Sequence, residues 1–157
     1  MAGKHPWVLL AYRLPREPST PRISVWRRLR QLGAVQLGDG LVALPLTDDT
    51  REQLEWLAQF VDDAAGEASV WIAEATTARQ HRELTTRMKD TVAADYRAVI
   101  EAAAAARRAD AHRRRRTALR LRRALDRIKG RDFFPPPERR QAERAVAELA
   151  ALVEAGR

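Results

Sequence analysis

The sequence lacks cysteine and is poor in histidine, which removes most familiar metal and redox sites. None of its 157 residues is cysteine, so disulfide bonds and thiolate metal ligands are excluded. The three histidines, His5, His81 and His112, do not have metal-ligand spacing, and His81 is expected to be solvated on a polar helix face. No phosphate-binding glycine loop, nucleophile elbow or zinc motif is present. We therefore expect no catalytic residue, no metal site, no cofactor and no enzyme activity.

Long apolar runs are also missing. No stretch approaches the roughly 18 apolar residues that a membrane-spanning helix requires. The first twelve residues lack the charged segment followed by an apolar run that marks a signal peptide. These absences predict a cytoplasmic protein with no membrane partner.

Charge is abundant but unevenly distributed. The chain has a net charge of +8. Residues 1–76 contain 8 basic and 10 acidic side chains, whereas residues 77–157 contain 21 basic and 11 acidic ones. We therefore predict two regions, 1–76 and 77–157, and a polyanionic partner for the basic second region.

The first region has the pattern of an α+β fold. Apolar runs predict four strands, and capping and stop residues predict two helices between them. Asp39-Gly40 between two apolar runs predicts a tight hairpin with positive φ at both central residues. Thr50 with Gln53 is expected to form a capping box at the second helix. The order of strand, helix, strand, strand, helix, strand is the ferredoxin-like split βαβ pattern, with four antiparallel strands and two helices.

The core of this region is predicted from the apolar positions. Trp26 shares a helix face with Val25 and Leu29, which favours burial over a role in stacking on bases. The first and fourth strands are expected to need cover, so a homodimer through a sheet edge or through the helices is one alternative. The side chains predicted to be largely buried are Trp7, Trp26, Leu29, Leu57 and Trp71.

The second region is predicted to be entirely helical. Apolar residues recur at steps of three and four from Leu84 to Ala103, which predicts a long helix. The apolar stripe is interrupted from Arg107 to Arg116, so a break is expected near 108–113. "DFFPPP" cannot continue a helix, and a last helix is expected at about 138–155. The fold class is therefore a ferredoxin-like domain followed by a C-terminal helical hairpin or bundle.

Arginines dominate one side of the helix expected at 113–131. Only Asp110 and Asp126 are acidic between residues 107 and 131, although a solvated helix face usually mixes charges of both signs. A stripe of roughly 27 Å results at 1.5 Å per residue, and the phosphate backbone of DNA is its favoured partner. The alternatives are acids elsewhere in the fold or in a dimer partner, a membrane surface, or a small oxyanion. The stripe contains Arg113, Arg116, Arg120, Arg123, Arg127 and Arg131.

Two further arginines precede the hairpin. Arg27 and Arg28 lie on the polar face of the helix that contains Trp26. They are candidates for phosphate contacts, but two arginines on a helix are weaker evidence than a continuous stripe.

The sequence also resembles a known family. "WVLLAYRLPREPSTPRISVWRRLRQLGAVQLGDGLVALP" and the later "LRRALDRIKGRDFFPPP" resemble the N-terminal domain of the chromate-resistance protein ChrB. The first stretch is also loosely similar to the middle domain of PaaX-type repressors, which is ferredoxin-like. The segment "RRADAHRRRR" departs from the family pattern, which often has phenylalanine and glutamate there. This departure puts an inherited role of that segment in doubt.

The resemblance implies a regulator that binds promoter DNA of chromate-resistance operons and responds to chromate. We therefore expect a DNA-binding or DNA-associated regulator in chromate or stress resistance that lacks the usual C-terminal domain. The alternative is a non-enzymatic protein-interaction module that docks a separate protein similar to the ChrB C-terminal domain.

Overall fold

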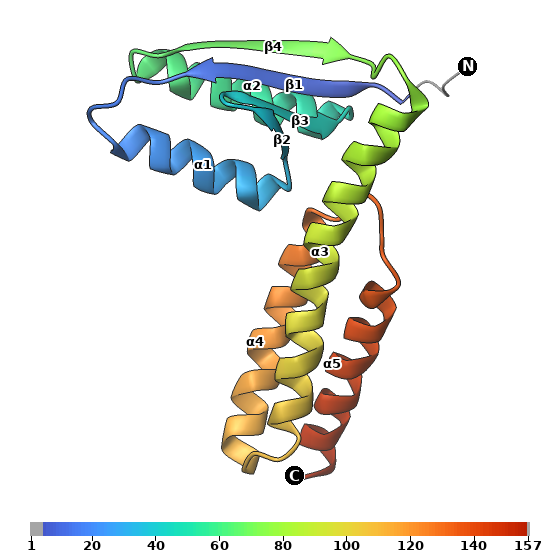
Figure 1. Ribbon diagram of the computed structural model, residues 1–157. Helices are drawn as coiled ribbons and strands as arrows, with labels where there is room; N and C mark the ends of the chain where they lie inside the picture. Colours follow the sequence, from blue (N-terminus) through green and yellow to red (C-terminus); the bar gives the residue numbers. More distant parts are fainter. Residues whose placement is uncertain (1–4, 157) are drawn as a thin grey trace. The chain divides into compact units, whose positions relative to one another are not determined.

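The computed structural model describes residues 5–156 (Figure 1). The chain divides into two compact units, one extending to Arg87 and the other beginning at Met88. The helix α3 (Ala78–Ala106) contributes residues to both units. The first unit therefore combines the sheet region with the first turns of this helix.

The first unit has the predicted order of elements. Its sheet has the strand order β2-β3-β1-β4, and every neighbouring pair is antiparallel. This arrangement confirms the predicted α+β fold. The expectation that the first and fourth strands need cover is wrong for the first strand, because β1 is central and the two edges are β2 and β4. The elements are β1 (Trp7–Arg13), α1 (Thr20–Leu32), β2 (Val35–Gly38), β3 (Leu41–Pro45), α2 (Asp48–Asp63) and β4 (Glu67–Ala73).

Helices α1 and α2 cover one face of the sheet (Figure 1). Alternate residues of β1 and β3 point to this face, as expected for half-buried strands. They meet the apolar stripes of the two helices. The fully or almost fully buried residues of this layer include Val8, Leu10, Val25, Leu29, Leu44, Leu54, Leu57 and Val61.

The first turns of α3 pack on the opposite face of the sheet. Trp7 is 3% exposed, and its Nε1 donates a hydrogen bond to Nδ1 of His81 at 3.2 Å. His81 is thus half-buried, which corrects the expectation of a solvated histidine. Burial lowers its pKa, and the nearby His5 lowers it further.

Two of the five tryptophan and leucine side chains predicted to be buried are exposed. Trp26 is 55% exposed and Trp71 is 60% exposed. Trp26 lies on the flank of α1, where the Arg30 guanidinium stands 4.9 Å from the ring centroid. Trp71 lies on the edge strand β4, in register with Leu9. An apolar pattern does not distinguish the flank of a helix or an edge strand from a core position.

Two details of turns and caps also differ from expectation. In the Asp39-Gly40 hairpin only Gly40 has positive φ, at 69°, and the strand pair is irregular between Gln36 and Gly38. A side chain at Gly40 would collide with the Tyr12 carbonyl oxygen. The capping box of α2 is formed by Thr47 and Thr50, three residues before the predicted pair.

The second unit is a three-helix bundle. The remainder of α3 lies beside α4 (Ala111–Gly130) and α5 (Glu138–Ala155) (Figure 1). Helix α3 ends at Ala106 and α4 begins at Ala111, which confirms the predicted break. Within residues 5–156, no helix has the length and apolar character needed to cross a membrane. The core comprises Val92, Tyr96, Val99, Ala103, Leu121, Leu125, Ile128, Ala142, Val146 and Leu149.

Candidate nucleic-acid interface

The interface begins where the chain turns from α3 into α4. Asp110 precedes α4, and its carboxylate accepts a hydrogen bond from the backbone N–H of Arg113 at 2.8 Å. This bond satisfies one of the free N–H groups of the first helical turn. Farther along, Leu121, Leu125 and Ile128 point into the bundle core. Because the helix has 3.6 residues per turn, the arginines three and four residues apart on α4 then lie on a different side of the helix, which faces solvent.

Five of the predicted arginines share one exposed side of α4, which we call the basic face. At 1.5 Å per residue they extend over about 21 Å of helix. Within residues 5–156, none of their side chains forms a hydrogen bond or an ion pair. The face therefore presents guanidinium groups that form no ion pair, with the Asp110 carboxylate at its N-terminal end. It consists of Arg113, Arg116, Arg120, Arg123 and Arg127.

Five acidic residues of the bundle form ion pairs with cations outside the basic face. Such pairing disfavours the alternative in which acids of the same fold neutralise the basic face. The two shortest pairs join Lys129 to Glu143 and Arg131 to Asp95, each at 2.9 Å. The others are Arg107 with Glu148 and Arg139 with Glu143, each at 3.3 Å, Arg139 with Asp132 at 3.5 Å, and Arg97 with Glu138 at 3.7 Å.

Arg131 does not belong to the basic face. Helix α4 ends at Gly130, and the Arg131 side chain is 22% exposed because it reaches Asp95 on α3. The spacing of three and four residues continues to Arg131, but Arg131 follows the end of the helix. The spacing therefore no longer places this side chain on a helix face. The structure therefore places Arg131 in the bundle and the other five arginines at the surface.

Two adjacent hollows lie at the N-terminal end of the basic face. Their volumes are about 530 and 500 Å³, and Arg113, Thr117 and Arg120 line both. The first hollow is lined by the Asp110 carboxylate and the His112 ring, and also by hydrogen-bond donors, which are three guanidinium groups, since Arg116 lines it as well, and the Thr117 hydroxyl. Such donors suit phosphate oxygens.

An apolar residue interrupts the outer surface of α4. Leu119 is 53% exposed. Arginines at all four positions three and four residues away surround it, namely Arg115, Arg116, Arg122 and Arg123. The sequence analysis did not single out Leu119. Its position outside the Leu121–Leu125–Ile128 stripe is the signal that could have identified it.

Arg114 differs from its neighbours in the arginine run. Its Nη2 donates to the carbonyl oxygens of Arg107 at 3.2 Å and Ala109 at 2.9 Å. These carbonyls lie where α3 ends, so Arg114 satisfies acceptors that the helix leaves free. It holds the turn that places the basic face and is not itself a surface cation.

Arg27 and Arg28 line a separate groove between α1 and α2. The groove has a volume of about 730 Å³, and Trp56 and Phe60 form its aromatic wall. Their rings stack with centroids 6.2 Å apart. Arg28 is held by Gln53 at 2.8 Å, whereas Arg27 is exposed. The sequence analysis missed Trp56, which is 61% exposed.

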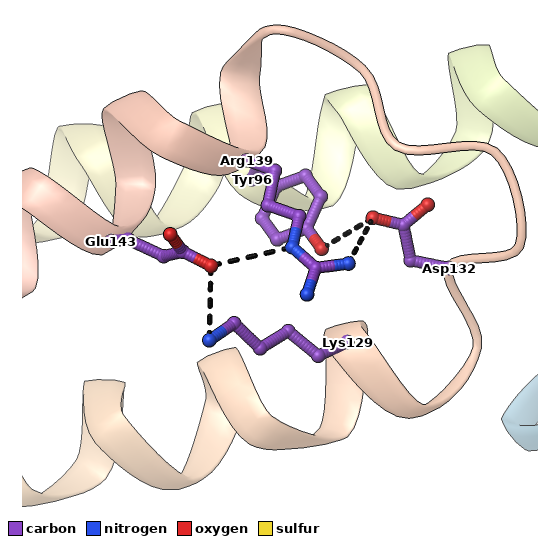
Figure 2. A network of polar contacts seen from close by, with 5 residues as sticks. All are labelled: Tyr96, Lys129, Asp132, Arg139 and Glu143. Carbon is purple, nitrogen blue, oxygen red and sulfur yellow. Dashed lines mark hydrogen bonds and ion pairs between the residues drawn. The ribbon is translucent and has the colours of Figure 1, made fainter.

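A polar network fixes the C-terminal end of α4 to the other two helices (Figure 2). The Tyr96 hydroxyl donates to Asp132 at 2.7 Å. Arg139 lies between Asp132 at 3.5 Å and Glu143 at 3.3 Å, and Lys129 also reaches Glu143. Burial raises the pKa of Tyr96, and the bond to Asp132 raises it further. Lys129 and then Arg139 lower the pKa of Glu143.

The comparisons with known proteins place the chain in a family. The family described as "Protein ChrB, N-terminal" matches residues 22–115. The chain is 30% identical over 152 residues to Protein ChrB of Cupriavidus metallidurans, covering 94% of this chain and 46% of that protein. The chain thus spans about half the length of this curated relative. No solved structure matches it. The chain belongs to the ChrB N-terminal family.

Proposed function

We propose that this chain is a non-enzymatic, DNA-associated transcriptional regulator in chromate or stress resistance. The observation that carries the proposal is the basic face, where five exposed arginines form no ion pair within residues 5–156. Arginine pairs with phosphate oxygens through two parallel hydrogen bonds. A straight row of such groups suits the DNA backbone and provides affinity without reading the bases.

The role in chromate resistance is supported by the family to which the chain belongs. In this proposal the basic face supplies the phosphate contacts, and Arg27 adds a weaker contact from the first unit. Arg28 contributes less because Gln53 already occupies its guanidinium.

A salt series on DNA from upstream of the gene for this protein tests the proposal. Each neutralised phosphate contributes a slope of about 0.9 in a plot of log affinity against log salt. Replacing Arg116, Arg120 and Arg123 together with glutamine should lower that slope by about two to three. The loss should be similar on any DNA sequence.

A matched variant controls for overall charge. Arg51, Arg79 and Arg82 are exposed arginines of the first unit, and their replacement with glutamine removes the same three charges. This variant should keep nearly the full salt slope. An unchanged slope in the basic-face variant, with its helical circular dichroism intact, would return the face to a merely solvated role.

The alternative is a protein-interaction module that docks a separate ChrB C-terminal-like domain. The groove between α1 and α2 favours it, because the groove combines exposed Trp56 with Arg27. Aromatic residues and arginine are enriched where proteins bind one another. Binding of that domain, abolished by Trp56→Ala while DNA affinity stays low, would favour this alternative.

Chromate sensing is a separate part of the proposal. If the part of the relative that this chain does not match carries sensing, the chain should bind chromate no better than sulfate. Calorimetry with both anions measures this difference. A clear preference for chromate would instead place the oxyanion site within these 157 residues, with the hollow beside Arg113 and Arg116 as its first candidate.

A further inference from the structure

The two edges of the sheet are protected to very different degrees. Strand β2 has four residues and an irregularity between Gln36 and Gly38. The carbonyl oxygen of Gln36 accepts a hydrogen bond from Arg87 at 2.7 Å. Short length, a bulge and a covering side chain are the devices by which natural sheets block pairing at an edge. The β2 edge is therefore closed.

The register shows which groups β4 presents at the other edge. Tyr12 N–H donates to Gly40, and Leu46 N–H donates to Pro6. Even-numbered residues of β1 therefore bond toward β3, and odd-numbered ones bond toward β4. Because Leu9 is in register with Trp71, the odd-numbered residues of β4 bond to β1. Ala68, Val70 and Ile72 consequently direct their backbone N–H and C=O groups to the free edge.

Strand β4 carries no protective device after its first residue, the charged Glu67. Residues 68–73, "ASVWIA", contain no charge, proline or glycine. Trp71 is 60% exposed on one face of the strand and Ile72 is 57% exposed on the other. The indole Nε1 of Trp71 donates to Ser69 at 2.7 Å, so its polar group is satisfied within the strand. The edge offers backbone bonds flanked by apolar surface on both faces.

We propose that β4 pairs with β4 of a second copy, antiparallel and about a twofold axis at Val70. Val70 is the middle residue of β4 (Glu67–Ala73), so the axis aligns Ala68 of one copy with Ile72 of the other. Two four-stranded sheets then become one continuous sheet. About six backbone hydrogen bonds form, two for each pair of residues that exchanges both bonds. Trp71 of each copy covers Ser69 of the other.

Charge favours a second copy as the occupant. Residues 1–87 contain 11 basic and 11 acidic side chains, whereas residues 88–157 contain 18 and 10. Two copies therefore meet through the neutral unit, with the uncharged residues 68–73 at the contact. A single strand pair with two tryptophans gives a modest interface, so we expect dissociation in the micromolar range.

Sedimentation velocity of the full chain without DNA tests the dimer. We expect a reversible monomer–dimer equilibrium across micromolar concentrations. Ile72→Lys places a charge on the edge and should weaken the dimer at least tenfold. Ile23→Lys adds the same charge at a similarly exposed isoleucine of α1 (46%) and should leave it unchanged. A chain that stays monomeric at every concentration, or a dimer that survives Ile72→Lys, would overturn the proposal.

Engineered thiols test the register, because the chain contains no cysteine. In Val70→Cys the two thiols face each other across the axis, with Cα atoms about 5.5 Å apart. In Glu67→Cys they lie about 20 Å apart, since six residues separate the positions along the strands. A short bismaleimide should therefore cross-link Val70→Cys and not Glu67→Cys. Equal cross-linking of both variants would contradict the register. Because no DNA is present, these outcomes are independent of the DNA-binding proposal.

Discussion

The two units of this chain offer opposite kinds of surface. The unit that ends at Arg87 has no net charge, whereas the unit that begins at Met88 carries the full +8. The first unit exposes three of its four tryptophans and an unprotected strand. The second unit exposes the arginines of the basic face, while five acids of the same unit form ion pairs with other cations. The net charge therefore belongs to one unit, and the exposed tryptophans and the arginines of the basic face occupy separate parts of the chain.

The units also differ in what stabilises them beyond their apolar cores. In the first unit the cap of α2 is formed by two threonine hydroxyls. In the second, a tyrosine and four charged side chains fix the end of α4 (Figure 2). Neutral hydroxyl bonds do not titrate between pH 3 and pH 10, whereas the charged network does. Substitutions that act on one unit at a time measure how much each kind of contact stabilises its unit.

The largest expected effects come from truncating a buried leucine in each unit. Leu54 and Leu149 are both fully buried, and Leu→Ala at such positions costs about 2–5 kcal/mol. All four tryptophans lie in the first unit, so tryptophan fluorescence follows its unfolding in denaturant, while circular dichroism at 222 nm is weighted toward the bundle. Leu54→Ala should shift the fluorescence transition and Leu149→Ala the dichroism transition.

The outcome decides whether the units are independent. If each variant moves only its own transition, the two units unfold separately. If Leu149→Ala shifts the fluorescence midpoint as much as the dichroism midpoint, the units unfold together and the comparison between them loses its thermodynamic meaning.

The sequence predicted the elements well because their signals are local. The break between α3 and α4 follows from polar residues at Arg107–Asp110, and the end of α4 follows from the prolines after Phe134. The order of strands and helices along the chain also followed from local signals, whereas the edges of the sheet did not, because β1 was expected at an edge and lies in the centre. These features require no knowledge of distant contacts.

Burial and pairing were harder to predict because they depend on distant neighbours. Trp26 and Trp71 have apolar patterns, yet one lies on a helix flank and the other on an edge strand. Arg131 continues the arginine period, but an aspartate 36 residues away in the chain holds it. One of the two hollows beside Arg113 is formed between the end of α3 and the start of α4, so it depends on how these helices pack.

The next largest effect is expected in the polar network of the second unit. Tyr96→Phe removes the hydroxyl that donates to Asp132, whose side chain is fully buried. Leaving a buried carboxylate without this partner should cost about 1–3 kcal/mol in denaturant unfolding. Tyr12→Phe is the control in the first unit, because the Tyr12 hydroxyl forms no hydrogen bond within residues 5–156, and it should cost below about 0.5 kcal/mol. If both variants lose the same free energy of unfolding, the bond from Tyr96 to Asp132 does not stabilise the second unit more than an unbonded hydroxyl would.

The same variant has a predictable alkaline signature. Burial raises the pKa of Tyr96 above its ordinary value, so the folded state holds its proton more tightly than the unfolded state. That contribution is complete below the unfolded pKa of about 10 and is lost as pH rises beyond it. The stability difference between the wild type and Tyr96→Phe should therefore shrink above pH 10, as measured by unfolding at several pH values.

A smaller effect is expected at the cap of α2. Thr47 Oγ1 accepts the backbone N–H of Thr50 at 3.0 Å, and Thr47→Ala should cost about 1 kcal/mol. Ser19 occupies the same position at α1 but makes no side-chain bond there, so Ser19→Ala should change stability little. Both are measured by tryptophan fluorescence. A cost for Ser19→Ala as large as that for Thr47→Ala would show that position, and not the bond, determines the effect.

The smallest expected effect separates charge from hydrogen bonding in the second unit. Lys129 and Arg139 lower the pKa of Glu143, so its ionised form stabilises the folded state above the unfolded pKa of about 4.3. That contribution is lost as pH falls through the lower, folded pKa. Because the Glu143 side chain is 37% exposed, solvent screens the pair, and Glu143→Gln should cost below about 1 kcal/mol at pH 7. Glu101→Gln, an exposed acid of α3 without a recorded ion pair, is the control and should cost less. The Glu143→Gln difference should narrow between pH 5 and pH 3 in the dichroism transition and should fall with added salt. A difference that stays constant across both series would mean that the carboxylate acts through neutral packing, and the pH dependence of the network would then rest on Tyr96 alone.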